Sequence, residues 1–394
     1  MNEKVIVAGV GMIPFTKPGA SEPYYAMGAR AVQAALADSG LSYEDIQQAY
    51  SGYVYGDSTA GQLPLYHVGL TGIPIVNVNN NCATGSTALF LARQAVASGA
   101  VDVAIALGFE EMRPGALQNM YKDRASALLK HEQATADIQG WDPEVGMSLQ
   151  YFGGAAIEYQ QRYGTKPETF ARVSVKARAH AANNPLALFR EAVTVEQVLQ
   201  SKPIFGPLTR LQCCPPTCGA AAAILVSPDF ARRRGLNSGV AIIGQEMETD
   251  GAASFDSKSM INVIGAQMTR AAADRLYAKA GIGADDIDVA ELHDCFTINE
   301  VISYEALGFA AEGEAERFIS DGDNSYGGKA VTNPSGGLLS KGHPLGATGL
   351  AQCYELTHQL RGTADARQVE GARLALQQNL GLGGACVVTL YERS

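Results

Sequence analysis

Three short segments of this sequence carry side chains suited to nucleophilic and acid–base chemistry. In the first, NVNNNCATGSTALFLARQAV at residues 77–96, Cys82 stands between an apolar run and a helix-like stretch. The run GIPIVNV predicts a strand, and the spacing of Leu89, Leu91 and Val96 predicts a helix. Cys82 is therefore expected in a strand-to-helix turn, where a helix N-terminus favours an anion and lowers a thiol pKa. The sequence thus predicts a nucleophile at Cys82, with a buried, inert cysteine as the alternative interpretation.

The second segment, GLLSKGHPLGATG at residues 337–349, places His343 in a Gly-rich turn before a predicted helix. Pro344 is expected at the first helical position, where its missing N–H costs nothing. If two similar halves of the chain pack about a pseudo-twofold axis, His343 faces Cys82 and serves as the base that activates the thiol. A histidine in a surface loop is the alternative interpretation.

The third segment is HDCFTINE, residues 293–300, which follows the strand-like run VAEL. His293 and Cys295 stand two residues apart, so both can point the same way from a strand end. A thiol beside an imidazole suits proton transfer at carbon, as general acid and base. The competing hypothesis is a zinc site formed by Cys82, His293, Cys295 and His343. Because no CxxC spacing supports such a site, we predict that no metal is bound.

Internal similarity indicates that the chain is duplicated. The stretch CATGSTALFLARQ from Cys82 matches HPLGATGLAQCYE from His343, so these two residues occupy equivalent positions. The alignment also pairs Gly85 with Gly346, Thr87 with Thr348 and Leu89 with Leu350. Two further pairs occur in the same order: LADSGLSYEDIQQAY with YAKAGIGADDIDVAE, and CGAAAAILVSPDF with GGACVVTLYERS. Three matches in one order favour two homologous halves over chance similarity.

Strand-like runs alternate with helix-like periods in both halves, which predicts α/β layers with mainly parallel strands. The runs are IVAGVG, YVYG and VDVAIALGF in the first half, and VAIIGQEM, VAELHD and LALQQNLGLGG in the second. Between Glu111 and Leu211 the alternation weakens, and we interpret this stretch as an inserted lid or loop domain. The predicted domains are 1–110 with 212–235 for the first half, 111–211 for the insertion, and 236–394 for the second half.

Composition limits the classes of protein and partner. The chain has 394 residues, 46% hydrophobic and 18% charged, which is enough for two sizeable cores. A formal net charge of −10 without a basic run argues against nucleic acid as a partner. No stretch of about 18 apolar residues occurs, so no membrane span is predicted. Seven scattered cysteines, a start unlike a secretory signal and an end unlike the peroxisomal Ser-Lys-Leu type favour the cytoplasm.

Taken together, NNNCATGSTA, HDCF, NPSGGLLSKGHPLGATG and NLGLGGA resemble the motifs of the thiolase superfamily, and within it the sterol-carrier-protein-2-type (SCP-x) thiolases. The similarity spans nearly the whole chain. It implies the α/β thiolase fold, with two duplicated βαβαβαββ halves in a layered αβαβα arrangement and a loop domain inserted in the first half. It also implies a homodimer or a dimer of dimers.

The resemblance assigns a role to each candidate residue. Cys82 is the nucleophile that becomes acylated, and His343 of the GHP motif activates it. His293 of HDCF takes the place of the asparagine that other thiolases carry in NEAF, and it helps to hold the thioester oxygen. Cys295 is the second reactive cysteine. Gly381 offers its backbone N–H to a second oxyanion hole, together with the N–H of Cys82.

The resemblance implies a 3-ketoacyl-CoA thiolase, with acyl-CoA and coenzyme A as partners and substrates and no permanently bound cofactor. Two alternatives remain: a non-catalytic acyl-CoA or lipid-binding protein, and a thiolase-fold aldolase or ketoacyl synthase. The sequence departs from the family pattern at Cys218, where an acidic residue is usual before Gly-Ala. We expect no lipid-carrier domain of the kind that is fused to some relatives.

Overall fold

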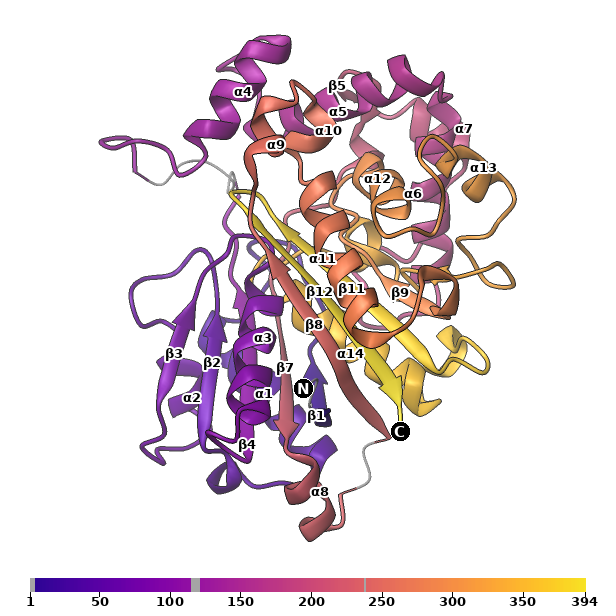
Figure 1. The fold of residues 1–394 in the computed structure, drawn as a ribbon. Helices are drawn as coiled ribbons and strands as arrows, with labels where there is room; N and C mark the ends of the chain where they lie inside the picture. Colours follow the sequence, from indigo (N-terminus) through magenta and orange to yellow (C-terminus); the bar gives the residue numbers. More distant parts are fainter. Residues whose placement is uncertain (1–3, 115–120, 237–238) are drawn as a thin grey trace.

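The structure is a computed structural model that describes residues 4–114, 121–236 and 239–394. A ten-stranded sheet runs through it, in the order β10-β9-β11-β12-β8-β1-β7-β4-β2-β3 (Figure 1). Its strands are β1 (Val5–Met12), β2 (Gln48–Gly52), β3 (Ile75–Val78), β4 (Val103–Glu110), β7 (Gly219–Val226), β8 (Val240–Glu248), β9 (Val289–Glu291), β10 (Val331–Thr332), β11 (Leu374–Gly381) and β12 (Ala385–Arg393).

The strand order confirms the duplication. From the centre outwards the first half has the order β1-β7-β4-β2-β3, and the second half has the equivalent order β8-β12-β11-β9-β10. The halves join where β1 pairs antiparallel with β8, with Val5 opposite Ile242. The prediction of mainly parallel strands is wrong, because β7 and β12, the last strands of the two halves, each run antiparallel to both of their neighbours.

One predicted strand is also misplaced. The run YVYG lies beyond the end of β2, and the strand is the preceding stretch QAYSG. The backbone N–H groups of Val54 and Tyr55 in YVYG donate to the carboxylate of Glu110 instead of to a neighbouring strand. A carboxylate at the end of β4 therefore fixes this loop.

Two equivalent helices, α3 (Thr84–Ala97) and α14 (Thr348–Arg361), lie between the halves and pack on each other. Both contact strands of the first and of the second half. The outer faces are covered by α1 (Tyr24–Ser39) on the first half and by α11 (Ala266–Ala280) on the second. This arrangement is the αβαβα layering that the resemblance predicts.

Shorter and inserted elements complete the fold. The remaining α-helices are α2 (Gln62–Tyr66), α4 (Leu129–Gln139), α5 (Met147–Tyr163), α6 (Pro167–Ala181), α7 (Val195–Leu199), α8 (Pro228–Arg234), α9 (Ala252–Asp256), α10 (Met260–Val263), α12 (Thr297–Ala306) and α13 (Ala315–Ser320). Single turns of 3-10 or π helix occur at Tyr43–Asp45, Arg210–Gln212, Ala284–Asp286, Gly337–Lys341 and Asp365–Arg367. Among the helices in the described ranges, none is both long and apolar enough to span a membrane.

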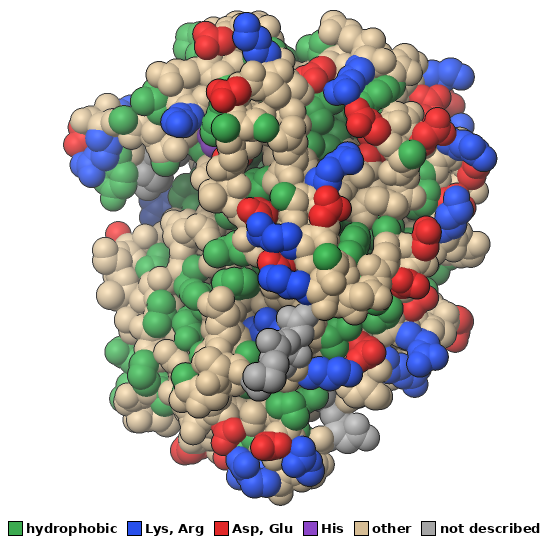
Figure 2. All heavy atoms as spheres, viewed as in Figure 1, with side chains coloured by type: hydrophobic (Ala, Val, Ile, Leu, Met, Phe, Trp, Pro, Cys, Tyr) green, Lys and Arg blue, Asp and Glu red, His purple; other side chains and the backbone are tan. Residues whose placement is uncertain are grey.

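Between β4 and β7 the chain forms helices α4 to α7 and a small hairpin of β5 (Pro203–Phe205) and β6 (Leu208–Thr209). Figure 1 shows these elements toward the end of the molecule that lies opposite α8. The predicted insertion, 111–211, includes residues 115–120, which lie outside the described residues, and its boundaries stay predictions. On the face drawn in Figure 2, acidic and basic side chains are intermixed, and a hollow separates α4 from the first half.

The two faces of a central strand belong to different cores, as β7 illustrates. Its sequence GAAAAILV is buried along its full length. Ala221 and Ala223 belong to the central core around α3 and α14, whereas Ala220 and Ala222 belong to the outer core under α1. Burial on both faces explains why this strand shows no alternation of apolar and polar residues.

Glycines let the N-termini of α3 and α14 approach each other closely. A Cβ added to Gly85 would lie 2.7 Å from the carbonyl oxygen of Gly346 and 3.1 Å from the backbone nitrogen of Gly349. A Cβ added to Gly349 would in turn collide with Ser86. Backbone atoms cannot move aside as the end of a flexible side chain can, so a larger residue would push the helices apart.

We therefore expect Gly85→Ala to destabilise the protein. Helix propensity alone predicts a gain of about 1 kcal/mol for a helical Gly→Ala change, whereas overpacking predicts a loss of about 1–3 kcal/mol. Urea unfolding of Gly85→Ala and of the wild type shows whether the free energy of unfolding rises or falls. The control is Gly251→Ala, because a Cβ at Gly251 meets nothing within 4 Å. A Gly85→Ala variant as stable as the wild type would contradict the close approach of the helices.

Candidate active site

Cys82 lies in the turn between β3 and α3, two residues before the first helical residue, as the sequence predicts. Asn81 takes a left-handed conformation with φ 51°, which turns the chain sharply. The N–H groups of Ala83 and Thr84 donate to the carbonyl oxygens of Asn80 and Asn81, both at 3.1 Å. The Cys82 side chain is partly buried at this turn, and its sulfur lies 3.6 Å from Asn81 Oδ1.

The expected lowering of the thiol pKa is not what the structure indicates. Burial, with a smaller contribution from the nearby carboxylate of Glu110, raises the pKa of Cys82 to about 12. Loss of hydration therefore outweighs the favourable field at the N-terminus of α3. The thiol is protonated in the ligand-free protein, so a nucleophile at this position requires a base.

His343 lies in an extended stretch before α14. Its backbone pairs with Pro216 in an isolated parallel bridge, and its N–H donates to Thr217 Oγ1 at 3.1 Å. Its ring Nδ1 lies 2.7 Å from Thr348 Oγ1. Burial lowers the pKa of this ring to about 3, so the imidazole is neutral.

The prediction that Pro344 opens the helix is wrong, since α14 begins four residues later at Thr348. Gly342, with φ 119°, and a turn over residues 344–347 come first. The carbonyl of Pro344 accepts the N–H of Ala347 at 2.9 Å, which closes this turn, and it also accepts the N–H of Thr348 at 3.0 Å. This turn separates the proline from the first residue of the helix.

His293 and Cys295 follow the end of β9, and both are buried. The backbone N–H of His293 donates to Gln378 Oε1 at 2.9 Å, and its ring Nδ1 lies 2.9 Å from Asn379 Nδ2. Burial and the neighbouring ring of His343 lower the pKa of His293 well below its usual value. The thiol of Cys295 has a pKa well above its usual value, through burial and through the nearby thiols of Cys214 and Cys82.

These segments meet where the two halves join. The sulfur of Cys82 and one ring nitrogen each of His293 and His343 lie within 4.8 Å of one another. The two imidazole rings are in a T-shaped contact, with centroids 5.0 Å apart and planes at 80°. The structure thus brings Cys82 and His343 face to face, as the repeat alignment predicts. Three of the four residues of the zinc hypothesis form this group, and thiolate and imidazole are the ligands that Zn²⁺ prefers.

Gly381 lies against the turn that carries Cys82. A Cβ at Gly381 would lie 2.9 Å from the backbone nitrogen of Ala83, so the end of β11 touches this turn directly. The side chain of Asn81 adds a link, since its Nδ2 donates to the carbonyl of Leu382 at 3.1 Å. The predicted partner of the Cys82 N–H is therefore next to it in space.

Glu110, at the end of β4, is a site residue that the sequence reasoning missed. It is fully buried and accepts the N–H groups of Val54 at 3.1 Å, Tyr55 at 2.9 Å and Gly346 at 3.0 Å. Burial raises its pKa to about 7. Glu110 links the first half to the loop after His343, and the signal that could have revealed it is an acidic residue that ends an otherwise apolar strand.

The segment of residues 212–218, which carries Cys213, Cys214 and Cys218, forms a wall of the site. Cys214 donates its N–H to the carbonyl of Cys295 at 2.9 Å, and Pro216 pairs with His343. The seven cysteines of the chain, including those of this segment, are free thiols. This segment connects the end of the insertion with β7 and touches both motifs of the second half.

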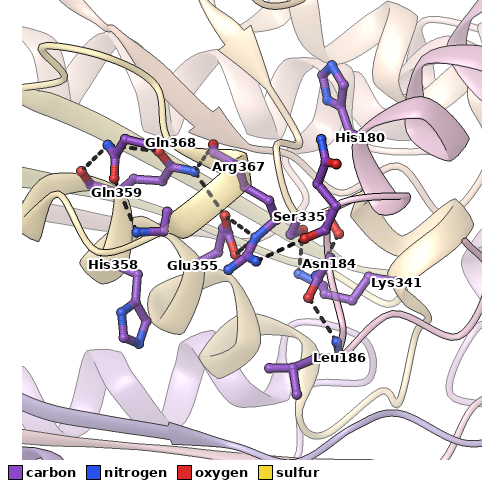
Figure 3. Close-up of polar contacts among 12 residues, drawn as sticks. His180, Asn184, Leu186, Ser335, Lys341, Glu355, His358, Gln359, Arg367 and Gln368 are labelled. Atoms are coloured by element: carbon purple, nitrogen blue, oxygen red, sulfur yellow. Dashed lines mark hydrogen bonds and ion pairs between the residues drawn. The ribbon is translucent and has the colours of Figure 1, made fainter.

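Buried polar groups hold the loop before His343 (Figure 3). Lys341 Nζ lies 2.8 Å from Ser335 Oγ. It also lies 3.1 Å from Glu291 Oε2. Asn184, which follows α6, donates from Nδ2 to the carbonyl of Ser335 at 2.8 Å. The loop that positions the imidazole is thus fixed from within the second half and from the segment after α6.

Two family models and several curated proteins match this chain. The family model described as "Thiolase, N-terminal domain" matches residues 5–193, and the model described as "Thiolase C-terminal domain-like" matches residues 251–391. "Sterol carrier protein 2" of Rattus norvegicus is 52% identical over 393 residues, which are 99% of this chain and 72% of that protein. "Acetyl-CoA acetyltransferase" of Methanothermobacter thermautotrophicus is 37% identical over 366 residues, which are 91% of this chain and 92% of that protein.

Solved structures with a similar fold also match this chain over its full length. The structure named "Ltp2-ChsH2(DUF35) aldolase" matches with a TM-score of 0.83 at 26% identity, over 100% of this chain and 98% of that chain. Human mitochondrial 3-ketoacyl-CoA thiolase in complex with CoA matches with a TM-score of 0.75, over 100% of this chain and 98% of that chain. At 19% identity this second match shows the fold alone.

The lowered pKa of the buried His343 predicts how the free energy of unfolding changes with pH. Its pKa is about 3 in the folded protein and about 6.5 in an unfolded chain. Below about pH 6.5 the unfolded state binds a proton that the folded state does not, so this contribution to stability is present above that pH and is lost as the pH falls towards 3. From about pH 7 to about pH 5, the wild type should lose about 2 kcal/mol more unfolding free energy than His343→Gln.

Urea unfolding at the two pH values measures this difference. The control is His67→Gln, which makes the same substitution at an exposed position. If His343→Gln and the wild type lose the same free energy between the two pH values, the imidazole is not held neutral by burial.

Proposed function

Because this chain belongs to the thiolase family, we propose that it is an acyl-CoA C-acyltransferase that cleaves 3-ketoacyl-CoA with free CoA through an acyl-cysteine intermediate. The reverse reaction is a Claisen condensation. Coenzyme A is a substrate in this proposal, and no permanently bound cofactor takes part. The name of the sterol carrier protein 2 relative supports a place in fatty-acid or sterol side-chain metabolism.

The observation that carries the proposal is the meeting of Cys82, His293 and His343 within 4.8 Å. A sulfur nucleophile with a thiol pKa of about 12 requires a base within reach. The oxygen that gains negative charge requires a hydrogen-bond donor. Two neutral imidazoles beside one thiol can supply both functions.

In the first half-reaction the Cys82 sulfur bonds to C3 of the substrate while its proton passes to His343. Both groups start neutral, because burial places the pKa of the thiol near 12 and that of the ring near 3. The proton therefore moves as the sulfur–carbon bond forms. The bond between C2 and C3 then breaks, and its electron pair becomes the enolate of the departing acyl-CoA.

His293 donates a hydrogen bond to the enolate oxygen, and Cys295 gives its proton to C2. The resulting Cys295 thiolate takes the proton of the incoming CoA, whose sulfur attacks the acyl group on Cys82. Backbone N–H groups of Cys82 and Gly381 stabilise the oxyanion of this second step. Cys82 leaves as a thiolate and recovers the proton held by His343, so the protein ends as it began.

The similarity to an aldolase structure favours one second candidate, a retro-aldol cleavage of a 3-hydroxyacyl-CoA. That reaction needs a base for the hydroxyl proton and a donor for the enolate, but it needs no nucleophile. A cysteine facing His343 is thus better explained by acyl transfer. A non-catalytic acyl-CoA or lipid-binding protein would use neither the base nor the thiol of Cys295.

We also propose a cytoplasmic location, since all seven cysteines are free thiols. A homodimer, or a dimer of dimers, is supported by β3, which forms one end of the ten-stranded sheet. An edge strand offers backbone N–H and C=O groups to a second chain. Apolar side chains are exposed around it: Leu63, Tyr66, Leu70 and Val76.

Acylation of Cys82 is the direct test of the reaction. After incubation with a straight-chain acyl-CoA, mass spectrometry should find one acyl group on the peptide that contains Cys82. Cys82→Ala should carry no acyl group and should lose at least about 10³-fold in the cleavage of 3-ketoacyl-CoA by CoA. Cys353→Ala, a change of a buried cysteine in α14, should still be acylated.

Cys295→Ala separates the two half-reactions. It should still accept an acyl group, because CoA can leave as a thiolate without an acid, but it should fail to cleave the carbon–carbon bond. It should also fail to exchange the α-protons of acetyl-CoA in D2O. Undiminished cleavage by Cys82→Ala would overturn the proposal, and retained turnover of a 3-hydroxyacyl-CoA by that variant would favour the aldolase.

Sedimentation velocity tests the dimer. Val76→Lys places a charge on the exposed edge strand, where Val76 is 39% exposed, and should convert the dimer into monomers. Met247→Lys makes a similar change on β8, where Met247 is 36% exposed, and should remain dimeric. A monomeric wild type, or a dimeric Val76→Lys variant, would contradict assembly through β3.

A further inference from the structure

We propose that the two site histidines are held in opposite tautomers, so that His293 donates from Nε2–H and His343 accepts at Nε2. The positioning residues are Gln377, Ser86 and Asn379 for His293, and Thr348 for His343. The inference deepens the proposed function and rests on it, since it names what makes one imidazole the oxyanion donor and the other the base. The resemblance assigns no role to Asn379, which receives a positioning role here.

The direction of the first hydrogen-bond chain is set at a backbone carbonyl, which can only accept. Gln377 Nε2 lies 2.8 Å from the carbonyl oxygen of Gly349, so the amide NH₂ must face that way. The same NH₂ donates to Ser86 Oγ at 2.7 Å. The opposite end of the amide, Gln377 Oε1, accepts the hydroxyl of Tyr391, which agrees with this orientation.

Ser86 has a single hydroxyl hydrogen, and it donates this hydrogen to Asn379 Oδ1 at 2.8 Å. The amide of Asn379 is thereby oriented with its NH₂ toward His293, where Nδ2 lies 2.9 Å from the ring Nδ1. Nδ1 must then be the unprotonated nitrogen. A neutral imidazole with a bare Nδ1 carries its hydrogen on Nε2.

Thr348 sets the opposite tautomer in His343. The Thr348 hydroxyl donates its one hydrogen to the carbonyl of Pro344 at 3.0 Å. It can therefore only accept from His343 Nδ1, which lies 2.7 Å away and must carry the hydrogen. His343 Nε2 is left as a bare, buried nitrogen without a hydrogen-bond partner in the described part of the chain.

The same assignment bears on metal binding. A ring nitrogen that carries a hydrogen cannot be a ligand, so His293 as positioned does not complete a site with Cys82 and His343. An aspartate at position 379 would accept a hydrogen from Nδ1 and leave Nε2 bare. It would thereby create the carboxylate–histidine–metal arrangement of natural zinc sites. The substitution Asn379→Asp should therefore convert His293 from a hydrogen-bond donor to an oxyanion into a ligand of Zn²⁺.

Nuclear magnetic resonance of protein with ¹⁵N-labelled histidine reads the tautomers in the ligand-free dimer. The chain has six histidines, and the loss of signals in His293→Gln and His343→Gln assigns the two rings. We expect a protonated Nε2 in His293 and a protonated Nδ1 in His343. In Ser86→Ala the amide of Asn379 loses its fixed orientation, and His293 should become a mixture of tautomers. The reverse assignment in the wild type, or an unchanged His293 in Ser86→Ala, would overturn the inference.

Kinetics of Ser86→Ala add a second measurement. Because part of the His293 population loses its donor to the oxyanion, kcat for carbon–carbon cleavage should fall about 10-fold while KM changes little. A rise in KM with unchanged kcat would indicate a role in binding substrate and would contradict the positioning role.

Metal titration of Asn379→Asp tests the gain of a ligand. We expect Zn²⁺ to bind this variant at least about 10-fold more tightly than the wild type. Co²⁺ should give a sulfur-to-metal charge-transfer band that disappears when Cys82→Ala is added. Equal Zn²⁺ affinity in the wild type and Asn379→Asp would contradict a fixed donor at His293 Nε2. If Asn379→Asp does not fold, the histidine resonances of the wild type and of Ser86→Ala still test the assignment of the two tautomers.

Neither the resonances nor the metal titration uses thiolase turnover. The expected tautomers without acylation of Cys82 would refute the proposed function alone. Acylation and cleavage with the reverse tautomers would refute this inference alone.

Discussion

The site depends on one constraint, which is that the backbones at the N-termini of α3 and α14 touch. Gly85 and Gly349 have no Cβ, and a Cβ on Gly85 would lie 2.7 Å from the carbonyl of Gly346. This contact joins elements of the two halves, and Cys82 and His343 stand just before the two helices. Because the backbones are in contact, the side chains just ahead of the helices reach each other within 4.8 Å.

The second constraint follows from the first, since close packing removes water. Loss of hydration disfavours every charged form, so it raises the pKa of the Cys82 thiol and lowers the pKa of both imidazoles. A preformed thiolate–imidazolium pair is therefore not the resting state. The site instead holds neutral groups whose proton transfers accompany bond formation, and the positions of hydrogen atoms become as important as the positions of charges.

Sequence reasoning found the parts that repetition and motifs encode, and it missed the parts that depend on tertiary contacts. The equivalence of Cys82 and His343 follows from aligned letters, and the strand order confirms the duplication. The predicted lowering of the Cys82 thiol pKa was wrong, because the position of a residue at a helix N-terminus does not reveal how deeply its side chain is buried. Pro344 was misplaced because a turn over residues 344–347 precedes α14, and the sequence pattern does not distinguish this turn from a first helical turn. Glu110 was missed because its three N–H partners come from two loops that only folding brings together.

The duplicated scaffold also explains how two equivalent turns came to carry different chemistry. In the first half, Thr87 donates its hydroxyl to the carbonyl of Ala83 at 2.9 Å, and in the second half Thr348 donates to the carbonyl of Pro344 at 3.0 Å. The two threonines occupy equivalent positions and make the same backbone contact. Each then has lone pairs left to accept a hydrogen. In the first half the donor is the side-chain amide of Asn80, at 3.1 Å, and in the second half it is the ring of His343. The repeat thus conserves the acceptor and varies the donor. At the equivalent positions of the two turns, Cys82 presents a sulfur and His343 presents an imidazole with a bare nitrogen.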